Sequence, residues 1–288
     1  AIPLVIISDS RAAGPPRARA AESAKRLLLR GYSAALVAGS ESRAYLESLG
    51  FPPGAIHQPW DVIDAAPFRR GAERARRRCR RLGWQPPPHF LCVARFVPEK
   101  NHAGLLEAYG AYQRQGGHWG LRLIGGGPLQ GELRRRRATL PDPDRLRIDD
   151  FRQQARLAVS YGMAGALVLP SRRDTWGLVV NEAIAAELPV LVSRACGCAV
   201  DLIAPEAGGW IFDPGDTAAL TSLLHRMEAL ASPHRQGKVA RCRERLGAFT
   251  LEAFAAGLVG AVEQARSQPR SSRRAVAVAE LLSRRPRP

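Results

Sequence analysis

Short apolar runs alternate with amphipathic stretches along this chain, and the alternation predicts most of its fold. In the first part of the chain, strand-like runs are expected at residues 3–7, 34–38 and 56–62, and helix-like stretches at 20–29 and 40–49. Strands that alternate with helices are typical of a parallel sheet with crossover helices. This part is therefore expected to form an α/β layer.

A second and longer alternating series begins at residue 89, and we expect Asn101 to cap its first helix. The expected strands cover residues 89–94, 121–124, 146–148, 166–169, 190–192 and 210–212. The expected helices cover residues 101–115, 129–137, 152–161, 178–188, 217–230 and 238–264. A series of this length is typical of a complete doubly wound α/β domain.

The two series predict an α/β chain with two Rossmann-like domains, each built on a parallel sheet. Residues 1–85 are expected to form a partial N-terminal domain that ends in an arginine-rich connector. Residues 86–265 are expected to form the C-terminal domain. Residues 266–288 are rich in Arg and Pro, so we expect a tail that is disordered in part.

Composition fits a globular chain and changes little else. The chain has 288 residues, of which 45% are hydrophobic, and no apolar run or leader of the kind that targets a membrane is evident. We therefore expect a cytoplasmic protein. The five cysteines are irregularly spaced, and no second ligand pair complements Cys196 and Cys198. Small buried thiols are expected in preference to a metal site or a disulfide framework.

The net charge of +17 first suggests a polyanionic partner, but the kind of basic residue argues otherwise. Only three of the 43 basic residues are lysines, a ratio that indicates biased codon usage. The arginine runs at 69–81 and 134–137 have two readings, either contact with anionic lipid head groups or solvated helix faces. Aromatic residues make up 6% and do not alternate with these runs, which argues against nucleic acid.

The segment of residues 171–183 carries the most specific chemistry. Asp174 follows the strand-like run, and Glu182 stands eight positions later inside the next helix-like run. Between them Trp176, Gly177 and Leu178 form a turn at a helix N-terminus, where backbone N–H groups lack intrahelical partners. Such N–H groups suit phosphate, and carboxylates suit sugar hydroxyls. The segment therefore indicates a nucleotide-sugar site.

This segment resembles the E-x7-E region of retaining glycosyltransferases of family 4, of the group 1 type, with Asp174 in place of the first Glu. Residues 93–101, 123–128 and 188–193 resemble three further family segments in the expected order. The resemblance extends over about residues 2–224. It implies the GT-B fold, with two Rossmann-like domains, of which the N-terminal one is incomplete here.

The resemblance implies a role for each matching residue. Arg95 and Lys100 would bind the donor diphosphate together with the backbone N–H groups of Gly177, Leu178 and Val179. Glu182 would accept hydrogen bonds from the ribose hydroxyls.

Two further roles concern the transferred sugar. Asp174 would hold its hydroxyls or stabilise positive charge on it, and Asp9 lies closest to the position of a family His that contacts it. The alternative reading of Asp174 is an acid that stabilises a helix N-terminus.

The nucleobase is expected near Gly126, Phe151 and Arg152. A tight strand-to-helix connection is an equally good account of the glycine-rich turn at residues 125–128.

The function expected from the resemblance is transfer of a sugar from a nucleoside diphosphate to an unknown acceptor, with retention of configuration. The acceptor would be a saccharide, a lipid or a small molecule, and neither a metal nor a cofactor is expected. Cell-envelope polysaccharide synthesis, with peripheral contact at the inner face of the membrane, fits this expectation. The alternative is a catalytically incomplete module that binds a nucleotide sugar or a partner.

Overall fold

The structure is a computed structural model that describes residues 3–13, 19–203, 210–230 and 232–270. The chain divides into two compact units. One comprises Ala1–Val62 with Phe249–Pro288, and the other comprises Ile63–Ala248. Each is described by itself.

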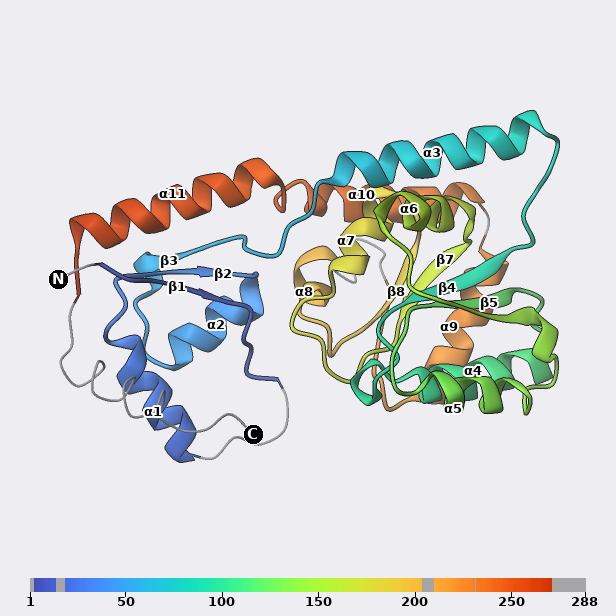
Figure 1. Ribbon diagram of the computed structural model, residues 1–288, viewed down its shortest axis with the longest axis horizontal. Coiled ribbons are helices and arrows are strands. Elements are labelled where there is room, and N and C mark those ends of the chain that lie inside the picture. The colour runs from blue at the N-terminus through green and yellow to red at the C-terminus, as the bar shows by residue number, and fades with distance from the viewer. Residues whose placement is uncertain (1–2, 14–18, 204–209, 231, 271–288) are drawn as a thin grey trace. The chain divides into compact units, whose positions relative to one another are not determined.

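The first unit is built on a parallel sheet in the order β1-β2-β3, drawn in blue in Figure 1. Its elements are β1 (Val5–Ser8), α1 (Arg19–Leu29), β2 (Ala34–Val37), α2 (Ser40–Ser48), the 3-10 turn η1 (Pro53–Ala55), β3 (Ile56–His57) and α11 (Leu251–Ser267).

Alternate residues of β2 face opposite sides of this sheet, and both sides are covered. On one side Ala35 and Val37 pack with Leu29 and Leu46, from α1 and α2. On the other side Ala34 packs with small residues of α11, including Ala261. Small side chains bring this helix close to the sheet, so the first unit has a core on each face.

One helical stretch of the described chain, Gly237–Ser267, is long and apolar enough by length and composition to cross a membrane. No such span was expected from the sequence. The structure divides this stretch into α10 and α11 at residues 247–250. The α11 part contacts all three strands of the first unit, as the core helix of a globular unit does.

The second unit is a doubly wound α/β unit with a six-stranded parallel sheet in the order β6-β5-β4-β7-β8-β9. Its strands are β4 (His89–Val93), β5 (Gly120–Ile124), β6 (Leu146–Asp149), β7 (Ala166–Leu169), β8 (Val190–Ser193) and β9 (Trp210–Phe212). Its helices are α3 (Ala65–Arg81), η2 (Pro98–Lys100), α4 (His102–Arg114), α5 (Gln130–Arg137), η3 (Pro143–Arg145), α6 (Gln154–Met163), α7 (Leu178–Ala185), α8 (Cys198–Leu202), α9 (Thr217–Ala229) and α10 (Ser232–Leu246).

The strand order reverses between β4 and β7. From β4 the chain runs outward through β5 and β6, and it then returns to the other side of β4 as β7. The loops that follow β4 and β7 therefore start side by side at the carboxyl edge of the sheet and lead to helices on opposite faces, α4 and α7. Such a switch point is where doubly wound sheets leave room for a ligand.

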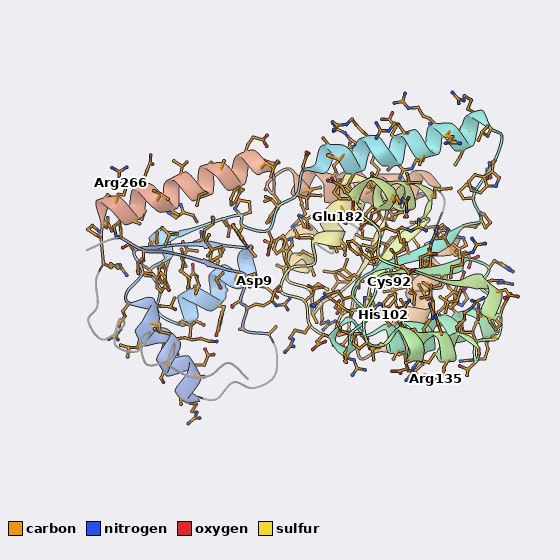
Figure 2. All side chains as sticks on the ribbon, viewed as in Figure 1. Asp9, Cys92, His102, Arg135, Glu182 and Arg266 are labelled. Carbon is orange, nitrogen blue, oxygen red and sulfur yellow. The ribbon has the colours of Figure 1, made fainter. Side chains whose placement is uncertain are left out.

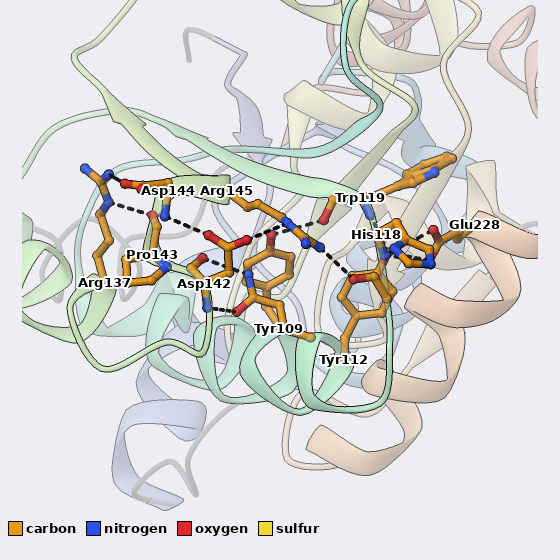
Figure 3. Close-up of polar contacts among 12 residues, drawn as sticks. Tyr109, Tyr112, His118, Trp119, Arg137, Asp142, Pro143, Asp144, Arg145 and Glu228 are labelled. Atoms are coloured by element: carbon orange, nitrogen blue, oxygen red, sulfur yellow. Dashed lines mark hydrogen bonds and ion pairs between the residues drawn. The ribbon is translucent and has the colours of Figure 1, made fainter.

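Helices cover both faces of the sheet, with α4, α5 and α9 on one face and α6 and α7 on the other (Figure 1). A polar network anchors the first of these layers (Figure 3). Tyr112 of α4 donates to Glu228 of α9, and the backbone N–H of Trp119 donates to the Tyr112 hydroxyl at 2.7 Å. Burial and the Glu228 hydrogen bond raise the Tyr112 pKa far above its usual value. The hydroxyl therefore stays a donor.

The connector helix α3 packs tightly on α6, because glycine and alanine line the contact. A Cβ built on Gly162 would lie 2.6 Å from the carbonyl oxygen of Ala72, and one built on Gly71 would lie 2.6 Å from the Ala158 Cβ. Distances this short leave no room for a larger residue. The α3 backbone is thus held directly against α6 within the second unit.

Most predicted elements are confirmed, and the differences have local causes. The strand expected at 56–62 ends at His57, and the single helix expected at 238–264 is two helices. Asn101 stands at the N-cap position of α4, as expected, but its side chain makes no capping hydrogen bond there, because its amide donates to the carbonyls of Pro170 and Pro214. Glu187, with a φ of 57°, follows the end of α7.

The division into units differs from the predicted domains in two places. The α3 helix, expected in the N-terminal domain, belongs to the second unit because it packs on α6 and α7. The α11 helix, expected in the C-terminal domain, belongs to the first unit. Residues 271–288 of the expected tail lie outside the described residues.

We predict that Gly162→Ala lowers the free energy of unfolding by about 1–3 kcal/mol, because the added methyl group meets the α3 backbone. Guanidinium denaturation measures this loss. The control is Gly237→Ala in α10, where no described atom lies within 4 Å of the added Cβ. That change is expected to leave stability equal or higher by about 0.5–1 kcal/mol. Equal effects of the two substitutions would contradict the close α3–α6 contact.

Candidate functional site

The candidate site lies at the carboxyl edge of the second sheet, where the strand order reverses. The loop after β4 carries Arg95 and leads through η2 to Lys100. The loop after β7 carries Asp174 and leads through Gly177 into α7. Parallel strands end at the same edge, so these two loops come together although they are far apart in sequence.

Lys100 and Asp174 form an ion pair across the two loops, with 2.5 Å between Nζ and Oδ2. Both side chains are largely withdrawn from water, at 16% and 11% exposed. The Ser171 hydroxyl donates to the same carboxylate oxygen at 3.3 Å. Lys100, expected to bind the diphosphate, and Asp174, expected to bind the sugar, thus contact each other.

The backbone around Asp174 is held by the loop that follows β8. The N–H of Asp174 donates to the Ala195 carbonyl, and the N–H of Gly197 donates to the Asp174 carbonyl, each at 3.2 Å. A Cβ on Gly197 would lie 2.0 Å from the Thr175 carbonyl oxygen, so this contact requires glycine. The neighbouring Cys196 and Cys198 are buried, as expected from the sequence.

The turn into α7 is shaped by Gly177 and Trp176. Gly177 has a φ of 102°, in the left-handed region that favours glycine. The Trp176 indole N–H donates to the Asn181 side-chain oxygen at 3.0 Å, and both residues are buried. The N–H groups of Leu178 and Val179 therefore begin the helix beside Asp174, where an α-helix leaves N–H groups without intrahelical acceptors.

Glu182 lies one turn into α7 and is labelled in Figure 2. The Tyr161 hydroxyl, from α6, donates to its Oε2 at 2.6 Å. Burial raises the pKa of Glu182, and this hydrogen bond opposes the rise. Burial and the adjacent carboxylate raise the Tyr161 pKa well above its usual range, so the hydroxyl keeps its proton.

Cations at the edge differ in their surroundings. Arg95 is exposed and forms no ion pair with an acidic side chain among the described residues. Arg172 follows β7, and its Nε donates to the Asn101 side-chain oxygen at 3.0 Å. His102 is buried beside Lys100, and burial together with this charge lowers its pKa to about 4. His102 is therefore neutral near pH 7.

The glycine-rich turn after β5 serves packing at two of its three glycines. A Cβ on Gly125 would lie 1.9 Å from the Ala94 carbonyl oxygen, and one on Gly127 would lie 2.6 Å from that of Phe96. At Gly126, by contrast, no described atom lies within 4 Å of an added Cβ. Space beside the turn is thus open at Gly126.

The remaining predicted residues lie on segments other than the two loops that carry the ion pair. Phe151 follows β6 at the same sheet edge and is 76% exposed. The Arg152 guanidinium donates hydrogen bonds to the Ser160 hydroxyl at 3.1 Å and to the Asp149 carboxylate at 3.3 Å. Asp9 follows β1 in the first unit (Figure 2), and its role stays a prediction.

Sequence reasoning missed three side chains of this site. Tyr161 precedes Glu182 by 21 positions, and nothing in its own segment marks it as a neighbour. Ser171 and Arg172 lie inside the motif segment and follow a strand, which is a signal that could have identified them.

Comparison with known proteins assigns the family. Residues 80–243, more than half of the chain, match the family described as Glycosyl transferases group 1. The chain belongs to this family.

Its relatives are longer proteins. The chain is 29% identical over 147 residues to the amylovoran biosynthesis glycosyltransferase AmsK of Erwinia amylovora, covering 49% of this chain and 36% of that protein. It is 28% identical over 188 residues to the GDP-mannose-dependent alpha-(1-6)-phosphatidylinositol dimannoside mannosyltransferase of Mycobacterium tuberculosis, covering 64% and 47%. The chain thus spans less than half the length of either relative.

A solved structure shares the fold. HepE of Anabaena, in complex with UDP-glucose, aligns with a TM-score of 0.68 at 16% identity, over 98% of this chain and 72% of that one. The predicted fold class, an α/β GT-B fold with parallel sheets, is confirmed.

We predict a pH-dependent difference in stability between the group 1 family chain and its Glu182→Gln variant. The Glu182 pKa is raised on folding from about 4.5, so the folded chain keeps a proton that the unfolded chain releases. Relative to the variant, the free energy of unfolding is highest below the unfolded-state pKa of about 4.5 and falls as pH rises through the higher, folded-state pKa. Denaturation from pH 4 upward, in the range where the chain stays folded, measures the difference.

Tyr161→Phe provides the control for this pH effect. Loss of the hydroxyl removes the hydrogen bond that lowers the Glu182 pKa, so the fall should extend to higher pH. If plots of the free energy of unfolding against pH stay parallel for all three chains, folding does not raise the Glu182 pKa.

Proposed function

We propose that this chain binds the donor of a retaining glycosyltransferase, which moves a sugar from a nucleoside diphosphate to an acceptor hydroxyl. The observation that carries the proposal is the ion pair of Lys100 and Asp174 beside the N-terminus of α7, with Glu182 one turn further along that helix. Asp174, then Lys100 with the helix N-terminus, and then Glu182 would match the order of sugar, diphosphate and ribose in a nucleotide sugar.

The diphosphate would bind between the two loops. Lys100, Arg95 and the first N–H groups of α7 supply positive charge and donors at one edge of the sheet. When the bond from the anomeric carbon to the diphosphate breaks, negative charge grows on the leaving phosphate. Cations already held in place stabilise that charge without reorganisation. These residues would supply what a metal ion supplies elsewhere, so metal-independent transfer is part of the proposal.

The Lys100–Asp174 contact explains how two subsites adjoin. The sugar of a nucleotide sugar is bonded directly to the terminal phosphate, so the groups that bind sugar and phosphate must be neighbours. Lys100 would then share its ammonium between the Asp174 carboxylate and a phosphate oxygen. Asp174, fixed by Ser171 and the Ala195 carbonyl, would accept hydrogen bonds from sugar hydroxyls. Its distance from Lys100 therefore sets the position of the anomeric carbon.

Glu182 would accept hydrogen bonds from the ribose hydroxyls. An ionised carboxylate is acceptor-only, so two hydroxyl donors suit it. Tyr161 occupies Oε2, and Oε1 and the remaining lone pairs are left for the ligand. The open space at Gly126 and the exposed Phe151 ring would lie near the nucleobase.

In the overall reaction, a bond from the anomeric carbon to an acceptor oxygen replaces the bond to the diphosphate. The departing nucleoside diphosphate carries away the electron pair of the broken bond and takes up the proton that the acceptor hydroxyl loses. Retention means that the new bond forms on the face that the diphosphate leaves. The relative named for amylovoran biosynthesis and the mannosyltransferase that acts on a phosphatidylinositol dimannoside support a saccharide or lipid acceptor. They also support a role in building the cell envelope, and we propose that this role is cytoplasmic.

We predict that Arg95→Ala, Lys100→Ala and Glu182→Ala each weaken nucleoside diphosphate binding at least tenfold, about 1.4 kcal/mol. Titration calorimetry with UDP and with GDP measures the change. Arg135→Ala and Glu187→Ala are matched controls, because both residues are exposed and neither lies at the carboxyl edge. Unchanged affinity in all three site variants would rule out the proposed donor site.

A ligand comparison separates the ribose role of Glu182 from a general loss of structure. We predict that Glu182→Gln weakens binding of the preferred diphosphate but has little effect on its 2′,3′-dideoxy analogue. The reason is that the analogue lacks the hydroxyls that the carboxylate would accept from. Equal losses for both ligands would assign Glu182 a structural role.

Turnover distinguishes the enzyme from a module that binds a nucleotide sugar or a partner without transferring anything. With the preferred nucleotide sugar, release of nucleoside diphosphate that Asp174→Asn abolishes would support transfer. Tight donor binding with no release in the presence of any saccharide or lipid acceptor would favour the module.

A further inference from the structure

We propose that the carboxyl-terminal end of α3 docks on an anionic lipid bilayer. The docking surface consists of Arg74, Arg78, Leu82, Trp84 and Val159, all in the second unit. It is separate from the donor site, because α3 leads here into the amino-terminal end of β4, whereas the donor site lies at the carboxyl ends of the strands. Docking at this surface is therefore independent of whether the donor binds at the proposed site.

Three large apolar side chains of this surface face water. Leu82 is 63% exposed, Trp84 is 47% exposed and Val159 is 40% exposed. They border a groove of about 420 Å³ whose floor includes Ala75, Cys79 and Met163. Single exposed apolar residues are common, but a contiguous group around a groove marks a binding surface.

The charge around the groove is of one sign. Arg74 and Arg78 line it, and none of its described lining residues is acidic. Seven arginines of α3 are exposed, namely Arg69, Arg70, Arg74, Arg77, Arg78, Arg80 and Arg81. The acid of this helix, Glu73, is already paired with Arg77. An anionic surface thus complements the outward face of α3.

The surface rests on a rigid support. Beside the groove, α3 is buried through Phe68, Gly71 and Ala72, and the last two meet α6 without space for larger side chains. The Phe68 ring also packs edge-on against the Tyr161 ring at 6.1 Å between centroids. Arg74 and Arg78 lie on this supported helix. Leu82 and Trp84 follow in the turn after it, where their backbone N–H groups donate to the carbonyls of Arg78 and Cys79. The turn is thus already tied to the helix end, which lowers the cost of ordering it on binding.

A bilayer fits this combination better than the other anionic partners. Nucleic acid takes aromatic stacking platforms along a basic track, whereas Trp84 is the aromatic residue of this surface and its neighbours Leu82 and Val159 are aliphatic. At a membrane interface, Trp sits at the headgroup level, aliphatic side chains enter the acyl boundary and arginines meet anionic head groups. Each component of the surface then has a partner.

A second arginine run in the same unit lacks this combination. In α5, Arg134 and Arg135 are exposed, but no large apolar side chain within residues 129–145 of the described chain is exposed. The α5 run has the same sign of charge and thus serves as an internal control for net charge alone.

The test is co-sedimentation of the whole chain with vesicles of equal parts phosphatidylglycerol and phosphatidylcholine, and with phosphatidylcholine alone. We expect binding to the anionic vesicles. Arg74→Glu with Arg78→Glu should weaken it at least tenfold, since each substitution replaces an attraction to the anionic head groups with a repulsion. Leu82→Ser with Trp84→Ser should also weaken it and make the remainder more sensitive to salt. The control pair, Arg134→Glu with Arg135→Glu, should have a much smaller effect.

Three results would overturn the proposal. One is no binding of the unmodified chain to anionic vesicles. Another is an equal loss in the α5 control pair, which would assign binding to net charge. The third is binding to single-stranded nucleic acid or an acidic polypeptide that depends on Arg74 and Arg78 while vesicle binding does not. Nucleoside diphosphate affinity of the same variants reports separately on the donor site, and we expect it to be unchanged.

Discussion

The ion pair between Lys100 and Asp174 is the contact on which the candidate site depends. It joins the loops after β4 and β7 across the point where the strand order reverses, with both charges largely withdrawn from water. A charge in such surroundings is costly without a partner, so the two loops stabilise each other's position. Because the same pair would divide the phosphate subsite from the sugar subsite, the geometry of the donor follows from it.

Close backbone contacts give this edge its shape. Gly125 and Gly127 lie against the loop after β4, and Gly197 lies against the loop after β7. Gly177 turns the chain into α7 with a positive φ. Each glycine brings backbone N–H and carbonyl groups to a surface where larger residues would collide. The site is therefore built from backbone packing first, and Glu182, held by Tyr161, is added from the helix that follows.

The arginines of this chain lie in two different kinds of surroundings. Its overall abundance reflects composition, and much of it forms solvated helix faces such as α5. Where arginines coincide with exposed Leu82, Trp84 and Val159, the same residue type becomes part of a surface with a specific chemistry. Only the spatial coincidence separates these cases, because the runs at 69–81 and 134–137 look alike in composition.

The sequence by itself determined the α/β class, every strand of the second sheet and the segment with Asp174 and Glu182, because apolar periodicity and turn residues are local signals. It did not determine that α3 belongs to the second unit and α11 to the first, since helix packing depends on contacts distant in sequence. Likewise, tertiary structure alone paired Lys100 with Asp174, 74 positions away, and placed the Tyr161 hydroxyl on Glu182. Asn101 shows the same limit, because distant carbonyls of Pro170 and Pro214 took the side chain that local rules assigned to a helix cap.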